Sequence, residues 1–116
     1  MDKAKFDKII HEMTEKIKEL LGDKLCSIIL YGSYARGDFD LESDIDIMVL
    51  TNANEKELKR LEDIACEFTW GLGMEHNILI STLVNNIEIF NLRLPAIPFY
   101  QNVKNEGGFL YDSKAS

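Results

Sequence analysis

The sequence has only two cysteines, no long apolar run and few basic residues, and each shortage excludes something. Cys26 and Cys66 lie far apart with no Cys-x-x-Cys pair, so we interpret them as two buried free thiols in a reducing cytoplasm. The longest apolar stretch, residues 28–31, is too short to cross a membrane. Residues 1–8 alternate charged and apolar side chains, unlike a signal peptide. Together these features predict a cytoplasmic protein without a membrane anchor.

The charge balance is acidic, with 13 Lys and Arg against 20 Asp and Glu, for a net charge of −7. Because affinity for DNA or RNA comes largely from basic side chains, bulk nucleic-acid binding is not expected. A small anionic substrate escorted by a divalent cation remains compatible, since carboxylates attract the cation. The length of 116 residues and the apolar content of 46% predict one globular domain spanning residues 1–116.

Hydrophobic periodicity predicts alternating helices and strands. Apolar residues recur every three or four positions over residues 6–21 and 58–72, which favours two amphipathic helices, the second interrupted by Gly71 and Gly73. Three short apolar runs, residues 25–31, 45–50 and 78–84, favour strands. Short helices are expected on either side of Pro95, and residues 109–111 pack or pair at the end. This order predicts an α/β fold: a small mixed sheet of three strands with helices on one face.

Two aspartates stand out in the second predicted strand. Asp44 and Asp46 are two residues apart, so their side chains point to the same face, while Ile45 and Ile47 turn to the core. Neighbouring carboxylates repel each other unless a cation lies between them. Oxygen ligands at this spacing suit Mg²⁺, which completes its shell with water and phosphate oxygens.

A glycine and a serine precede this pair by ten residues. Gly32 permits a tight turn after the first strand, and Ser33 offers a hydroxyl. If residues 33–36 form a helical turn, their free amides make a phosphate seat. The connecting loop is long enough to bring the second strand back beside the first, which places the seat and the acidic pair at one edge. Arg36 is either a phosphate ligand or a salt-bridge partner of Asp38 or Asp40.

Gly32-Ser33, ten residues, then Asp44-Ile45-Asp46 resembles the signature of the DNA polymerase β-like nucleotidyltransferase superfamily. The strings YGSYARG (31–37) and SDIDIMV (43–49), with the segment 98–111, are similar to its minimal prokaryotic members, over most of the chain. The resemblance implies the nucleotidyltransferase fold, a nucleoside triphosphate such as ATP held at Gly32, Ser33 and Arg36, and Mg²⁺ held by the aspartates. It also implies transfer of a nucleoside monophosphate to a hydroxyl, with the aspartates as catalytic residues.

One departure from the family pattern opens an alternative. The family usually carries a third metal-binding carboxylate on the next strand, but residues 77–84 contain no acid. Leu79 occupies the expected position, and Glu75 could serve only if that strand began early. The resemblance further implies a helical partner of the HEPN type, with this chain as antitoxin. Either the chain modifies such a partner covalently, or it has lost transfer and acts by binding alone.

A few other residues carry weaker expectations. Tyr34 either stacks on a base or packs internally, and His76 is more simply a surface group than a metal ligand. Trp70, Phe68 and Met74 are expected to fill the core beneath the second long helix. A final group is expected to form a solvated acidic loop with a capping serine: Asp38, Asp40, Glu42 and Ser43.

Overall fold

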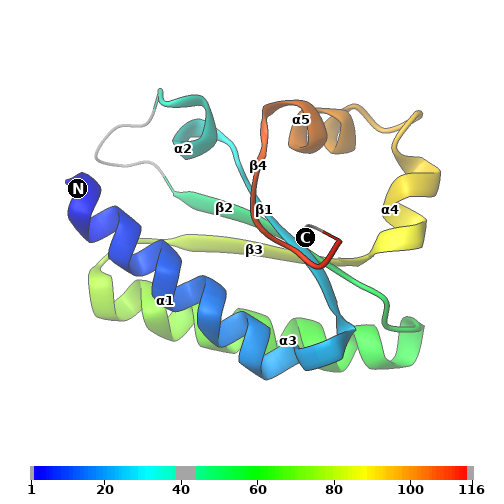
Figure 1. Ribbon diagram of the computed structural model, residues 1–116, viewed down its shortest axis with the longest axis horizontal. Coiled ribbons are helices and arrows are strands. Elements are labelled where there is room, and N and C mark those ends of the chain that lie inside the picture. The colour runs from blue at the N-terminus through cyan, green and yellow to red at the C-terminus, as the bar shows by residue number, and fades with distance from the viewer. Residues whose placement is uncertain (1, 39–43, 115–116) are drawn as a thin grey trace.

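A four-stranded mixed sheet organises the chain in a computed structural model that describes residues 2–38 and 44–114 (Figure 1). The strand order is β3-β2-β1-β4, with β2 and β3 parallel and the other neighbours antiparallel. The strands are β1 (Leu25–Tyr31), β2 (Ile45–Thr51), β3 (Ile80–Asn86) and β4 (Gly108–Asp112). The helices are α1 (Lys3–Leu21), the 3₁₀ turn η1 (Gly22–Lys24), α2 (Ser33–Arg36), α3 (Glu55–His76), α4 (Ile87–Arg93) and α5 (Pro98–Glu106).

The sheet has one strand more than the three predicted. The end segment, expected to pack or pair, forms β4 and pairs antiparallel with β1, with Leu30 opposite Gly108. This strand was hard to foresee because it is short and its register is broken by an irregularity between Ile28 and Ile29. The sheet is nevertheless mixed, as expected, because the α3 crossover makes β2 and β3 parallel.

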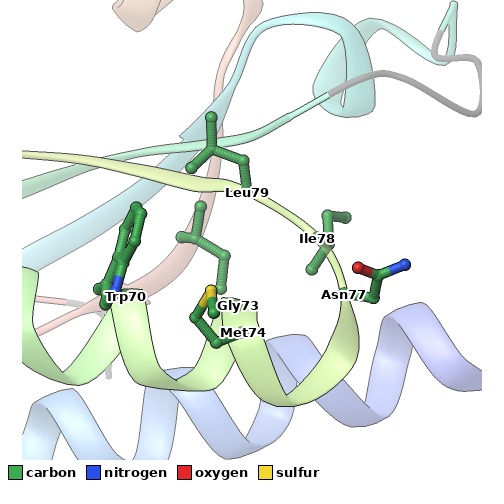
Figure 2. A pocket seen from close by; sticks show the side chains of 7 residues that line it. Trp70, Gly73, Met74, Asn77, Ile78 and Leu79 are labelled. Carbon is green, nitrogen blue, oxygen red and sulfur yellow. The ribbon is translucent and has the colours of Figure 1, made fainter.

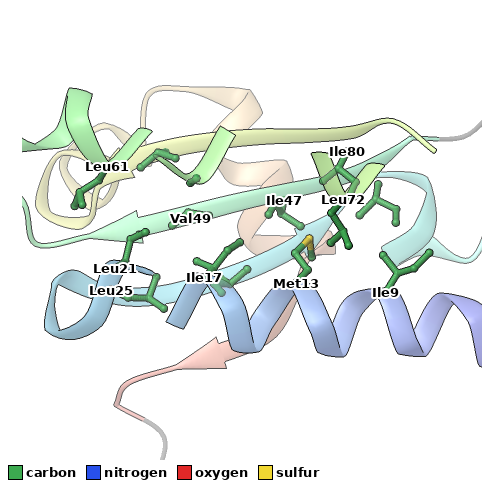
Figure 3. Packing of buried hydrophobic residues seen from close by; sticks show 14 of the residues in the cluster. Ile9, Met13, Ile17, Leu21, Leu25, Ile47, Val49, Leu61, Leu72 and Ile80 are labelled. Carbon is green, nitrogen blue, oxygen red and sulfur yellow. The ribbon is translucent and has the colours of Figure 1, made fainter. Parts of the chain in front are cut away.

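The two long helices lie together on one face of the sheet, and the main core forms beneath them (Figure 3). The prediction that the helices pack on one face holds for this long pair and is wrong for the short helices α4 and α5. Ile9, Met13 and Ile17 of α1 and Ile47 and Val49 of β2 are fully buried there. The short helices α4 and α5 lie over the other face, above β1 and β2, around a smaller cluster (Figure 1). Its buried members are Ile29, Met48, Leu50, Phe90 and Val103. No helix in the described residues is both long and apolar enough to span a bilayer.

The α3 helix is longer than predicted. Its N-terminus is capped by Asn54, whose side chain accepts a hydrogen bond from the Glu57 amide at 3.0 Å. The helix runs unbroken through both glycines to His76, so the expected interruption is wrong. Gly73 is needed for packing instead, since a Cβ there would collide with the carbonyl of Ile78 where the chain turns into β3.

The prediction that Trp70 and Met74 are core residues is also wrong. Trp70 is 61% exposed and Met74 is 68% exposed, while Phe68 packs partly buried against the main core, as predicted. Trp70 and Met74, four residues apart, lie on one side of α3 and Phe68 lies on another, because each helical position turns by about 100°. Only the side of α3 that faces the sheet and α1 is covered.

Candidate functional site

The ends of β1 and β2 bring the two sequence motifs together. Their antiparallel register places Tyr31 opposite Asp46, so Gly32 and Ser33 leave β1 directly beside the acidic pair. The loop between them lies mostly outside the described residues, and so do the expectations for Asp40, Glu42 and Ser43. The predicted juxtaposition of the Gly-Ser turn and the aspartates at one sheet edge is therefore observed.

Gly32 lies against the carboxylate of Asp46. A Cβ built on Gly32 would be 2.5 Å from Asp46 Oδ2, so only glycine leaves the carboxylate in place. Gly32 also has φ +77°, a conformation that side chains rarely adopt. Both requirements act at the point where β1 ends and α2 begins, and they make this glycine part of the site.

The residues after Gly32 form the predicted helical turn, α2. The amide of Arg36 bonds the carbonyl of Gly32 at 3.0 Å, and Gly37 closes the turn on Ser33 at 2.9 Å. The ring of Tyr34 stacks on Phe6 of α1, with centroids 4.8 Å apart and planes 6° from parallel. Of the two readings of Tyr34, the internal packing contact is thus present in the structure.

The acidic pair is electrostatically strained. Partial burial raises the pKa of Asp46 above its ordinary value, and the charge of Asp44 raises it further, while Arg36 acts in the opposite direction. Asp44 is half-buried and begins the approach to β2. Two carboxylates that repel each other on an open sheet face gain from a cation between them, so the donor set fits a hard divalent ion.

Arg36 is held by acidic side chains on both sides. Its Nε donates to Asp38 at 3.1 Å, and its Nη1 donates to Glu106 at the end of α5 at 3.0 Å. These hydrogen bonds raise the pKa of Arg36. The salt bridge to Asp38 was one of the two predicted roles, whereas Glu106 was missed because the two residues are 70 positions apart. The role in phosphate binding stays a prediction.

Glu75 is not brought to the acidic pair. It lies on α3, where its carboxylate clusters with Glu12 of α1 and His76, within 4.8 Å of one another. His76 Nε2 is 4.0 Å from Glu12 Oε2. The long helices cover the face that holds Ile45 and Ile47, whereas Asp46 points to the opposite face. The suggestion that Glu75 completes the metal set is therefore wrong, because α3 extends past it and β3 starts later than expected.

The neighbouring strand offers no carboxylate in its place. In the parallel register Ser81 lies beside Asp46, and Leu83 lies beside Met48. Leu79, one step before β3, shares their face and is 48% exposed. The face of β3 beside Asp46 thus carries a hydroxyl between two leucines, and Leu79 stands at the position where the resembled family is expected to carry a third acid.

Tyr31 is a site residue that the sequence reasoning missed. Partial burial, with a smaller contribution from the charge of Asp46, raises the pKa of Tyr31 to about 12, so its hydroxyl stays protonated. Its ring meets Phe99 edge-on, with centroids 5.6 Å apart and planes 81° from parallel. The available signal was strand parity, since the last residue of β1 must face the same way as its partner on β2.

A mixed sheet with a Gly-Ser turn against an Asp-x-Asp strand end defines a nucleotidyltransferase-fold domain. A family model described as "Polymerase beta, Nucleotidyltransferase" matches residues 15–116, so the chain belongs to that family. The chain is 32% identical over 105 residues to "Putative protein adenylyltransferase MJ0604" of Methanocaldococcus jannaschii, covering 90% of this chain and 97% of the relative. A second relative from that organism, "Putative protein adenylyltransferase MJ0141", is 40% identical over 78 residues, covering 66% of this chain and 75% of the relative.

Solved structures share the fold. The first is titled "Crystal structure of the toxin-antitoxin with AMP-PNP", with a TM-score of 0.55 and 21% identity, covering 89% of this chain and 73% of that one. The second, a mutant of the toxin-antitoxin MntA-HpeT, has a TM-score of 0.50 and 23% identity, covering 86% of this chain and 73% of that one. At these identities the likeness establishes the nucleotidyltransferase fold.

Proposed function

We propose that this domain transfers a nucleoside monophosphate, AMP in the first instance, from a nucleoside triphosphate to a hydroxyl on a partner protein. The observation that carries the proposal is the contact of Gly32 with the Asp46 carboxylate. This contact keeps a backbone turn able to approach phosphate within reach of an acidic pair able to hold a cation. The names of the relatives, protein adenylyltransferases, support ATP as the donor.

Asp44 and Asp46 are the residues that would hold Mg²⁺. The fit rests on their chemistry: both are oxygen ligands, they stand on one face, and their mutual repulsion already disfavours the charged form of Asp46. When bound, the ion supplies Lewis-acid stabilisation of the charge that develops on the phosphates. Repulsion between the two carboxylates also lowers the stability of the metal-free protein. A bound cation would relieve that repulsion and so stabilise the fold.

In the proposed reaction, the acceptor oxygen forms a bond to the α-phosphorus and the bond to the β-phosphate oxygen breaks. Pyrophosphate leaves with the bonding electron pair, and the acceptor hydroxyl loses its proton. The turn after Gly32, with Ser33, would orient the phosphates. Arg36 would contribute positive charge to the leaving group, since a guanidinium pairs well with phosphate oxygens. Tyr31, protonated at neutral pH, is able to donate a hydrogen bond at the same face.

The proposed partner is a helical protein of the HEPN type, with this chain as the antitoxin. The support for an antitoxin role is that structures sharing the fold are titled as toxin–antitoxin assemblies, while the HEPN type of the partner is what the sequence resemblance implies. Nothing in the charge of −7 opposes a protein acceptor, whereas it disfavours nucleic acid.

The proposal is tested by incubating the protein with α-labelled ATP, Mg²⁺ and a co-expressed helical partner. Label should appear on the partner and not with the double variant Asp44→Ala and Asp46→Ala. The matched control is Asp23→Ala, which removes an exposed carboxylate next to the opposite end of β1. Equal labelling by the wild type and the double variant would contradict the assignment.

A second function is favoured by one observation: the neighbouring strand β3 places a serine, and no acid, beside Asp46. Weakened metal binding would leave a module that neutralises its partner through contact alone. Calorimetry followed by the labelling assay separates the two functions. Binding of ATP with Mg²⁺ but no transfer of label identifies a nucleotide-binding module, whereas binding with transfer identifies an enzyme.

A further inference from the structure

The outer edge of β3 carries an apolar surface that neither the proposed site nor the core uses. Trp70 and Met74 project from one side of α3, and Leu79 precedes the strand, with all three substantially exposed. They line a cavity of about 260 Å³ with Gly73 and Ile78 (Figure 2). Figure 2 shows Trp70, Met74 and Leu79 gathered where α3 turns back toward the sheet. We call this the Trp70 surface.

In the part of the chain that the structure describes, the backbone of β3 has no strand partner along the same edge. The strand order β3-β2-β1-β4 leaves one side of β3 without a neighbouring strand in the described sheet. The Ile45 amide bonds the Leu79 carbonyl at 3.0 Å, so the backbone of Leu79 faces β2. Because consecutive residues alternate, Ile80, Thr82 and Val84 turn their amides and carbonyls outward. Within the described residues, the contact recorded on this side is the Cys66 thiol, 3.6 Å from the Thr82 carbonyl.

This edge also lacks the charges that usually protect an exposed strand. Natural edge strands commonly carry lysines or other charged side chains that prevent pairing with another chain. Residues 77–87 contain no charged side chain, in a protein whose net charge is −7. At β3, two copies would bring together strands that carry no charged side chain.

We propose that two copies of this chain associate through β3 and the Trp70 surface, about a two-fold axis. Antiparallel pairing of a strand with itself is self-complementary, which a two-fold interface requires. A specific interface needs about 1,000 Å² in total, or about 500 Å² from each copy. One buried aromatic supplies about 150–250 Å². Met74, Leu79 and the strand edge are placed to provide the remainder.

Sedimentation equilibrium over a range of protein concentrations tests the proposal. The wild type should sediment at twice 13.3 kDa and dissociate on dilution, whereas Trp70→Glu and Met74→Glu should sediment at 13.3 kDa. Leu92→Glu is the matched control, since Leu92 is 79% exposed on α4 and lies outside the proposed interface. Circular dichroism spectra unchanged from the wild type exclude unfolding as the cause.

Trp70 is the sole tryptophan, so its fluorescence reports directly on the interface. Emission should move to longer wavelength as the wild type is diluted, and it should stay at the long-wavelength position in Met74→Glu. A monomeric wild type with water-exposed Trp70 at every concentration would overturn the proposal and leave this edge to a partner of different sequence. A dimer that persists in both glutamate variants would overturn it equally.

Discussion

Gly32 lies so close to the carboxylate of Asp46 that a Cβ on residue 32 would be 2.5 Å from Asp46 Oδ2. We therefore expect Gly32→Ala to push this carboxylate aside and to lower the affinity for ATP with Mg²⁺ by at least about tenfold, or about 1.4 kcal/mol. The backbone at φ +77° should add a loss of stability of about 1–3 kcal/mol. Calorimetry and thermal unfolding measure the two effects separately.

Gly37→Ala is the control for this prediction. Gly37 has φ +81°, but a Cβ there would meet nothing within 4 Å. The substitution should cost about 1–2 kcal/mol of stability through backbone strain and leave the acidic pair in place. If both alanine variants lost nucleotide affinity equally, the cause would be a loosened α2 turn and not the contact with Asp46.

Neutralising Asp46 should stabilise the fold while it abolishes metal binding. Burial and the charge of Asp44 raise the pKa of Asp46, so its ionised form is less favourable in the folded chain than in the unfolded one. Asp46→Asn should therefore raise the melting temperature by about 1–4 °C at neutral pH without Mg²⁺. Calorimetry should show no Mg²⁺–ATP binding, and Asp23→Asn should change neither quantity. A fall in melting temperature would argue against the strained pair.

The same pKa shift sets a pH dependence. A carboxyl whose folded pKa is raised contributes stability that is fully present below the unfolded pKa and is lost as pH rises through the folded pKa. Metal binding has the opposite trend, since it needs Asp46 ionised. Mg²⁺ affinity should therefore fall on acidification with a midpoint above the ordinary value of 3.8. Calorimetric titrations of the wild type at a series of pH values check this, and an affinity that does not change on acidification would contradict it.

A third carboxylate can be introduced at Ser81. The parallel register of β2 and β3 puts Ser81 beside Asp46, so Ser81→Asp should place three acids on one face. Without metal the variant should be less stable by about 1 kcal/mol through like-charge repulsion. With Mg²⁺ it should gain more in melting temperature than the wild type. Ser81→Asn, similar in shape but uncharged, should show no such gain, and an equal gain would mean that Ser81 does not face the pair.

Local patterns were enough to predict most of the fold. The spacing of apolar residues identified α1 and α3, and strand parity put Asp44 and Asp46 on one face opposite Ile45. These predictions hold because helix and strand periodicity act over a few residues. The turn at Gly32 and Ser33 was also predicted correctly, because a glycine there directly follows the apolar run of β1 and precedes α2.

Features set by contacts between distant segments were not predictable. The spacing of apolar residues in α3 does not reveal which of them another element will cover, and Trp70 and Met74 are left exposed. Nothing near Arg36 indicates that Glu106 will approach it after 70 residues. The short β4 strand likewise depends on pairing with β1 and has little signal of its own.

Substitutions in the Arg36–Glu106 pair test whether Arg36 binds phosphate or only holds α2 in place. Both side chains are partly exposed, so solvent screens the salt bridge and its loss should change stability little. Arg36→Ala should weaken ATP binding about threefold to tenfold, because a guanidinium contact with the phosphates is lost. Glu106→Gln keeps the guanidinium and removes a competing carboxylate, so ATP affinity should stay equal or rise. Calorimetry of both variants decides, since an equal loss in the two would show that Arg36 acts through its bond to Glu106, by holding α2 in place.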